Sequence, residues 1–169
     1  MSTILNTNGE SLKVPKAASR DFTFHIVTAE WNPAITHTLR DGAIAAFLEA
    51  GVPEENIVQH KVPGTVELVN AAASIMNANL PDGVIVIGCV IRGDTPHFDY
   101  VCMHTATGVA MLNAKGLTPV TFGVLTVDNL EQAQQRAGGI LGNKGSEAAC
   151  AAIDMANLRF HLAQDIRDK

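Results

Sequence analysis

The chain of 169 residues has little charge and few aromatic side chains: charged residues make up 17% of it and aromatic residues 5%. Soluble domains usually carry about 25% charged residues, so a protein of this size is short of charge for its surface. An alanine-rich, helix-heavy composition would explain the shortage, and so would a surface covered by other subunits. Composition alone leaves both explanations open.

The cysteines, the net charge and the apolar runs exclude several classes of protein. The three cysteines form no C-x-x-C pair and no N-x-S/T sequon occurs, which suits a reducing interior, so we expect a cytoplasmic protein. The formal net charge of −5 comes without a basic stripe, so we expect no nucleic-acid and no membrane partner. The longest strongly apolar run, residues 83–91, is too short to span a bilayer.

Familiar cofactor motifs are missing as well. No G-x-G-x-x-G follows the first predicted strand. Residues 142–146 look like a phosphate loop, but Asn143 stands where the signature needs a glycine before Lys144. His97 and His104 are seven residues apart and no cysteine lies at ligand spacing from them. The sequence therefore predicts no metal, dinucleotide or nucleoside triphosphate site.

Hydrophobic periodicity divides the chain into an arm and one domain. Residues 1–20 have no period and lack the apolar core of a signal peptide, so we expect an N-terminal arm that is ordered only where a partner holds it. Residues 21–169 form the single domain, in which strand and helix patterns alternate. Strands are predicted over residues 22–29, 57–62, 83–91 and 119–127, and helices over residues 33–50, around 66–76, 98–114, 129–137 and 145–165.

This order predicts an α/β fold, a three-layer αβα sandwich in which helices cover both faces of a four-stranded parallel sheet. In such sheets, ligands bind beyond the carboxyl ends of the strands. The candidates for a functional site are therefore the residues that follow Ala29, Val62, Ile91 and Val127.

Two of these strand ends carry residues that suit an organic ligand. Trp31, the only tryptophan, is either a core side chain or a flat platform for a heteroaromatic ring, with Asn32 as a hydrogen-bonding neighbour. Thr65 opens a helix, so unpaired backbone N–H groups point into the cleft. Glu67 either compensates the helix dipole or accepts hydrogen bonds from a polyol.

The third strand end suits an anion and a proton transfer. Gly93 allows a tight turn, Thr95 can donate from side chain and backbone, and the next helix presents its positive end there, which predicts an anion site. His97 follows at the junction, and histidine titrates near neutral pH. Together these features suit a condensation between an aromatic amine and a small phosphorylated carbonyl compound.

Four sequence blocks resemble the 6,7-dimethyl-8-ribityllumazine synthase family, which catalyses the penultimate step of riboflavin biosynthesis. They are residues 62–67, residues 88–102 (GCVIRGDTPHFDYVC), residues 122–126 (FGVLT) and residues 142–145 (GNKG). The resemblance covers about residues 22–160. It implies a flavodoxin-like fold and a condensation of 5-amino-6-(D-ribitylamino)uracil with 3,4-dihydroxy-2-butanone 4-phosphate, which releases phosphate and water without a metal or organic cofactor.

The resemblance also implies a role for each matching residue. His97 matches the proton-transfer residue, and Trp31 the ring that stacks on the pyrimidine. The positions that match the phosphate site are Thr95, the backbone amides around Asp94, and Arg136, which is its cation. Asp94 itself is a flanking residue. The other positions that match contacts to the ribitylaminouracil are Asn32, Thr65, Val66, Glu67, Val90, Ile91, Phe122 and Lys144.

The resemblance further implies a homo-oligomer. The family forms pentamers, some of which associate into particles of up to sixty subunits. Phe122 matches a ring contributed by a neighbouring subunit, and Lys144 lies near the same shared site, which favours covered surface as the cause of the low charge. The alternative functions are a non-catalytic flavin- or phosphate-binding module of flavodoxin-like fold, and a relative that has lost activity.

Overall fold

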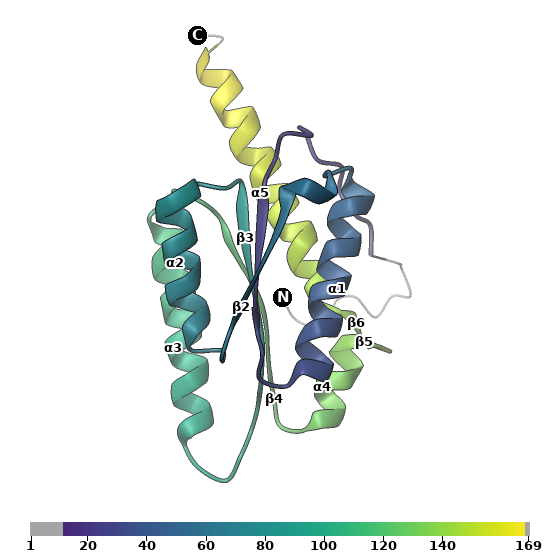
Figure 1. The fold of residues 1–169 in the computed structure, drawn as a ribbon, viewed down its shortest axis with the longest axis vertical. Helices are drawn as coiled ribbons and strands as arrows, with labels where there is room; N and C mark the ends of the chain where they lie inside the picture. The colour runs from purple at the N-terminus through teal and green to yellow at the C-terminus, as the bar shows by residue number, and fades with distance from the viewer. Residues whose placement is uncertain (1–11, 168–169) are drawn as a thin grey trace.

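A computed structural model describes residues 12–167 (Figure 1). Its centre is a parallel sheet with the strand order β2-β1-β3-β4. The strands are β1 (Phe24–Ala29), β2 (Ile57–Val62), β3 (Gly83–Ile91) and β4 (Val120–Val127). Because Ala29 pairs with Val62 and Ile91 with Val127, the carboxyl ends of neighbouring strands meet at one edge of the sheet.

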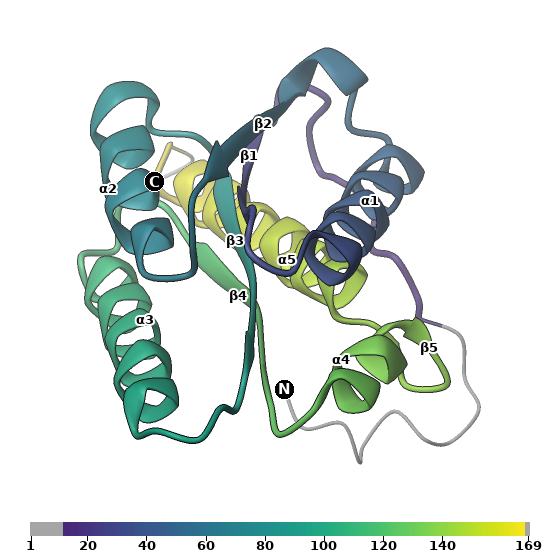
Figure 2. The same cartoon turned by 60° about the horizontal axis from the view of Figure 1, so that its bottom comes forward.

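Helices cover both faces of this sheet, as Figures 1 and 2 show. On one face lie α1 (Pro33–Ala50), α4 (Leu130–Arg136) and α5 (Lys144–Arg167), and on the other lie α2 (Glu67–Asn79) and α3 (His97–Ala114). The predicted three-layer αβα sandwich is thus confirmed. Among residues 12–167, no helix combines the length and the apolar character needed to cross a membrane.

The sheet separates two hydrophobic cores, because the side chains of each strand alternate between its faces. Under α1 and α5, the rings of Phe24 and Phe47 stack with their centroids 4.3 Å apart and pack with Leu39 and Ile153. Under α2 and α3, Val27 and Val86 pack with Leu68, Met76 and Val109. The continuous apolar run of β3 serves both cores, as expected for a strand buried on both faces.

Three short elements were not predicted from the sequence. A 3-10 turn, η2 (Glu54–Asn56), precedes β2, and β5 (Ala137–Gly139) pairs with β6 (Gly142–Asn143) in an antiparallel hairpin between α4 and α5. The hairpin lies beside α1 (Figure 1). Segments of two or three residues are too short to show a periodicity, so the pattern that located the main strands could not locate these.

The described part of the N-terminal arm lies against α1 and α5 of its own chain. The Asn157 side chain donates from Nδ2 to the Lys16 carbonyl at 2.9 Å and accepts at Oδ1 from the Ala18 N–H at 2.8 Å. The Ala17 N–H donates to the Ala50 carbonyl at 3.1 Å. The chain itself thus supplies contacts that we expected from a partner, while residues 1–11 of the predicted arm lie outside the described residues.

Candidate active site

A pocket of about 430 Å³ opens at the carboxyl edge of the sheet, between the starts of α2 and α3. The site residues predicted from the first three strand ends line it together: Trp31, Asn32, Thr65, Val66, Glu67, Val90, Ile91, Thr95 and His97. Gly64, Cys89, Gly93, Phe98 and Val101 complete the lining. Residues up to 70 positions apart in the sequence thus share one cavity because parallel strands end at the same edge.

The loop after β1 presents an aromatic ring to this pocket. Trp31 is 72% exposed, so it is not a core side chain. Asn32 takes the left-handed backbone conformation with φ 59° and ψ 54°, and its Nδ2 donates to the Cys89 carbonyl of β3 at 2.9 Å. This bond fixes the loop to the central sheet and leaves the indole beside the cavity.

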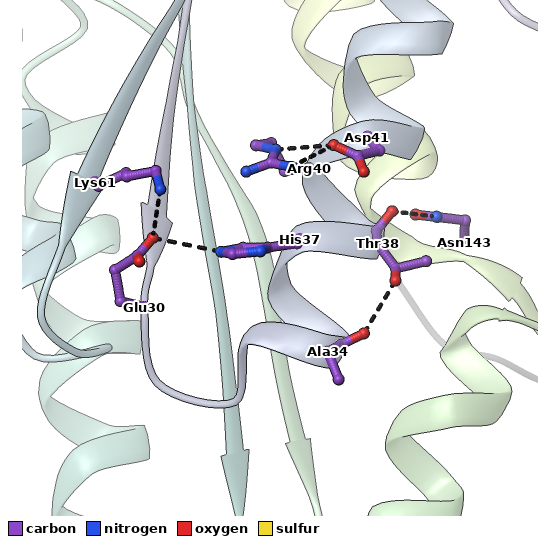
Figure 3. Close-up of polar contacts among 8 residues, drawn as sticks. All are labelled: Glu30, Ala34, His37, Thr38, Arg40, Asp41, Lys61 and Asn143. Carbon is purple, nitrogen blue, oxygen red and sulfur yellow. Dashed lines mark hydrogen bonds and ion pairs between the residues drawn. The ribbon is translucent and has the colours of Figure 1, made fainter.

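Polar contacts from α1 and β2 hold the same loop outside the pocket (Figure 3). Glu30 Oε1 lies 3.4 Å from both His37 Nε2 of α1 and Lys61 Nζ of β2. Desolvation, the largest single influence, raises the pKa of the Glu30 carboxyl, but the hydrogen bonds and charges of His37 and Lys61 together outweigh it and lower the pKa. Because the three side chains are exposed or half-buried, each contact adds only a little stability.

The start of α2 approaches the sheet closely beside the pocket. A side chain at Gly88 of β3 would bring its Cβ within 2.8 Å of Thr65 Oγ1, so the absence of a side chain there admits the buried Thr65. Thr105 Oγ1 of α3 lies 2.9 Å from the Val101 carbonyl of its own helix and 3.4 Å from the Thr65 carbonyl, so α3 lies close to the segment that leads into α2. Val66 and Glu67 remain exposed at the pocket.

The loop between β3 and α3 has backbone N–H groups available to a ligand. Within residues 12–167, the N–H groups of Gly93, Asp94 and Thr95 make no hydrogen bond. Thr95 lines the pocket and His97 begins α3 there, whereas the exposed Asp94 is outside the lining. A helix start with free N–H groups suits an anion.

The cysteine of the pocket is not suited to nucleophilic chemistry. Burial raises the pKa of the Cys89 thiol to about 11, so the thiol stays protonated at neutral pH, whereas a nucleophile needs the thiolate. Within residues 12–167, no group of three or more His, Cys, Asp and Glu side chains is arranged to hold a metal ion.

Three predicted site residues lie away from this pocket. Phe122 is on the edge strand β4 and is 38% exposed. Arg136 ends α4 and donates from Nη1 to the Gln132 carbonyl at 2.9 Å. Lys144 begins α5 and donates to Glu147 Oε1 at 2.6 Å. Both cations belong to the helical layer opposite α2 and α3 (Figure 2), so one chain does not bring them to the cavity.

Residues 142–146 form a helix junction and not a phosphate loop. Asn143 Oδ1 caps α5 by accepting from the Gly145 and Ser146 N–H groups, and its Nδ2 donates to the Thr38 carbonyl of α1 at 2.9 Å (Figure 3). A side chain on Gly145 would collide with the Leu39 carbonyl. This segment therefore fixes α5 against α1 and sets the position of Lys144.

The sequence did not lead us to expect Cys89, Phe98 and Val101 in the pocket. Val101 had a usable signal, because it follows His97 by four residues on the same helix and so shares its face. Phe98 had none of this kind, because adjacent residues of a helix do not face each other. Cys89 had a weaker signal than Val101, since it shares a face of β3 with Ile91.

Comparison with known proteins agrees with this geometry. Residues 21–159 match the model of the family described as 6,7-dimethyl-8-ribityllumazine synthase. The chain belongs to this family. Proteins with that name from Porphyromonas gingivalis and Bacteroides fragilis are each 51% identical to it over 139 residues, which cover 82% of this chain and 86% and 97% of theirs. The protein of that name from Phocaeicola vulgatus is 47% identical over 149 residues, 88% of both chains. The resemblance read from the four sequence blocks is therefore confirmed.

Proposed function

We propose that the chain is a transferase that condenses 5-amino-6-(D-ribitylamino)uracil with 3,4-dihydroxy-2-butanone 4-phosphate to 6,7-dimethyl-8-ribityllumazine, phosphate and water, in riboflavin biosynthesis. One observation carries the proposal: in a member of this family, a single pocket gathers an exposed indole, the starts of two helices and a histidine. The indole suits a flat aromatic amine, the helix starts suit a polyol and a phosphate, and the histidine suits proton transfer.

The ribitylaminouracil occupies the side of the pocket formed by β1, β3 and α2. Trp31 stacks on the pyrimidine ring, because an exposed indole offers a large flat surface to a heteroaromatic ring. Glu67 accepts hydrogen bonds from the ribityl hydroxyls beside Thr65 and Val66, and Val90 and Ile91 border the ring. Asn32 acts by holding the loop, because its Nδ2 is bound to the Cys89 carbonyl.

The butanone phosphate binds at the start of α3. The free N–H groups of residues 93–95 and the Thr95 hydroxyl surround the phosphate, and the positive end of α3 favours its charge. Asp94 flanks this site with its carboxylate outside the pocket lining. A cation is still needed to balance the phosphate, and Arg136 supplies it from a neighbouring copy of the chain.

His97 moves protons in each step of the condensation. The aryl amine attacks the butanone carbonyl and water leaves to give a Schiff base. Phosphate then leaves by elimination, and the ribityl-bearing nitrogen closes the second ring with loss of water. Holding both substrates in register supplies most of the acceleration, and a positioned acid and base adds to it.

The working form is a homo-oligomer in the cytoplasm, a pentamer or a larger particle of pentamers. Support comes from three site residues that lie outside the pocket of their own chain, Phe122, Arg136 and Lys144. Phe122 and Lys144 match a site that the family shares between subunits, and Arg136 matches the cation of the phosphate site. The exposed ring of Phe122 on the edge strand suits contact with a neighbour.

The test is to mix both substrates with the purified protein and follow the absorbance and fluorescence of the lumazine. We expect product with both substrates and none when either is omitted. Binding of ribitylaminouracil or inorganic phosphate without product would instead indicate a non-catalytic binding module or a relative that has lost activity.

A further inference from the structure

The loop that carries Thr95 and ends at His97 is held very little by its own backbone. Its nearest backbone bonds lie at its ends, where the Arg92 N–H donates to the Val127 carbonyl at 2.9 Å and the Asp99 N–H donates to the Pro96 carbonyl at 3.0 Å. Between these bonds, the N–H groups of residues 93–95 make none within residues 12–167. A site that must place reacting groups within a fraction of an ångström needs a further support.

The Arg92 side chain connects the two ends of this loop. Its Nε donates to Asp128 Oδ1 just beyond β4 at 3.1 Å, and its Nη1 donates to Asp99 Oδ1 in the first turn of α3 at 3.3 Å. Its Cζ lies 4.0 Å from the centroid of the Phe98 ring, which lines the pocket. Arg92 is itself outside the lining.

We propose that Arg92 is a positioning residue, a clasp that joins the end of β4 to the first turn of α3 and thereby sets the places of Thr95 and His97. The inference rests on the proposed function for what those two residues do. Each contact of Arg92 is weak alone, because exposed ion pairs and cation–π contacts contribute little. Their effect lies in geometry, since one rigid, planar guanidinium holds Asp128, Asp99 and Phe98 at once.

The same position allows a rival role, in which Arg92 binds the substrate phosphate directly. The two roles make opposite predictions for Asp128→Asn. If Arg92 acts as a clasp, loss of the Asp128 carboxylate loosens the loop and slows the reaction. If Arg92 binds phosphate, loss of a competing carboxylate leaves phosphate affinity unchanged or raises it.

The experiment compares Arg92→Gln, Asp128→Asn and the double variant in the full chain. Three quantities are measured: kcat and KM for both substrates, the dissociation constant of inorganic phosphate, and hydrogen exchange of the Asp99 and Tyr100 amides, which donate to the Pro96 carbonyl. Arg92→Lys tests whether a point charge suffices. Arg40→Gln is the matched control, because Arg40 makes an Arg–Asp contact with Asp41 on α1 (Figure 3).

The clasp predicts that Arg92→Gln lowers kcat by about tenfold, since a small misplacement of reacting groups costs up to a hundredfold. Asp128→Asn should lower kcat less, and the double variant should be no worse than Arg92→Gln, as for two groups acting through one contact. Arg92→Gln and Asp128→Asn should each speed hydrogen exchange of the Asp99 and Tyr100 amides. Arg92→Lys should not restore the kcat of the wild type. Arg40→Gln should change neither kcat nor the rate of exchange.

Unchanged exchange in Arg92→Gln would overturn the clasp, as would an Asp128→Asn variant with wild-type kcat and tighter phosphate binding. Full rescue by Arg92→Lys would also overturn it in favour of direct phosphate binding. If the wild-type protein forms no lumazine, the proposed function fails, and the exchange data still decide whether Arg92 holds the loop.

Discussion

The candidate site residues occupy two regions of the molecule that differ in construction. In the first region, at the carboxyl edge of the sheet, Trp31, Thr95 and His97 line one cavity within a single chain. In the second region, the cations lie in the opposite helical layer and are already bound to their own chain, Arg136 to the Gln132 carbonyl and Lys144 to Glu147. The first region forms a pocket within one chain, whereas we propose that the second region acts across a boundary between copies.

The largest effect on activity is expected at Arg136, and mixing two variants tests whether Arg136 of one chain serves the pocket of another. Arg136→Ala should lower kcat/KM for the butanone phosphate by about a hundredfold, because a hydrogen bond to a charged group is lost. Co-refolding this variant with His97→Ala in equal amounts should restore about a quarter of wild-type activity, because some interfaces then join an intact pocket to an intact arginine. Lumazine formation measures the recovery.

The control for this mixing is to refold each variant alone, which should leave its activity low. Absence of recovery in an assembled mixture would mean that Arg136 acts within its own chain or outside the site. Sedimentation of the mixture establishes that the copies have associated.

Within the first region, His97→Ala should lower kcat by about ten- to a hundredfold, which is at or below the lower end of the contribution of a general acid or base, because holding the two substrates in register supplies most of the acceleration. The affinity for ribitylaminouracil should change little, because Trp31 and Glu67 remain. His104→Ala is the control, since His104 is an exposed histidine of the same helix and is absent from the pocket lining. Wild-type turnover in His97→Ala would remove His97 from the proton transfers.

The contrast between the two regions also explains which site residues could be predicted from the sequence alone. Trp31, Glu67 and His97 could be located without any relative, because they follow recognisable strands and parallel strands end at a common edge. The role of Asn32, which holds its loop against the sheet, could not be predicted in this way. Its bond to the Cys89 carbonyl joins residues 57 positions apart and requires a left-handed backbone, and neither feature leaves a periodic trace.

The second region depended on the family resemblance for a different reason. Arg136 and Lys144 follow no strand of the main sheet, and the hairpin between them is made of strands of three and two residues. Within one chain, Arg136 contacts the Gln132 carbonyl and Lys144 contacts Glu147, whereas the contacts that we propose for them lie on another copy. Local pattern therefore located residues that line one pocket of this chain, whereas the residues that we propose to act between copies were located by the resemblance.

A smaller effect is expected at the junction that positions Lys144. Asn143→Ala should lower the free energy of unfolding by about 0.5–2 kcal/mol, the cost of removing a helix cap. Asn143→Asp keeps the acceptor for the Gly145 and Ser146 N–H groups but lacks the donor to the Thr38 carbonyl, so its loss should be smaller. Denaturant unfolding measures both, and equal stability of all three proteins would contradict the cap.

The smallest effect concerns the strands that lead to the first region. His25 Nδ1 of β1 lies 2.9 Å from His60 Nε2 of β2, and burial, together with the nearby His60, lowers the pKa of His25 below its ordinary value of 6.5. Since the unfolded chain then binds this proton more readily than the folded chain, stability is full above pH 6.5 and falls as the pH drops toward the lowered pKa. The slope is at most about 1.4 kcal/mol per pH unit for one proton.

The measurement is the free energy of unfolding between pH 7.5 and pH 5, the lower limit lying about 1.5 units below the ordinary histidine pKa. The change with pH should be smaller in His25→Gln than in the wild type, because the group that binds the extra proton on unfolding is gone. His161→Gln, which removes an exposed histidine of α5, should keep the wild-type slope. If the His25→Gln slope equals that of the wild type, the acid sensitivity does not arise from the contact between His25 of β1 and His60 of β2.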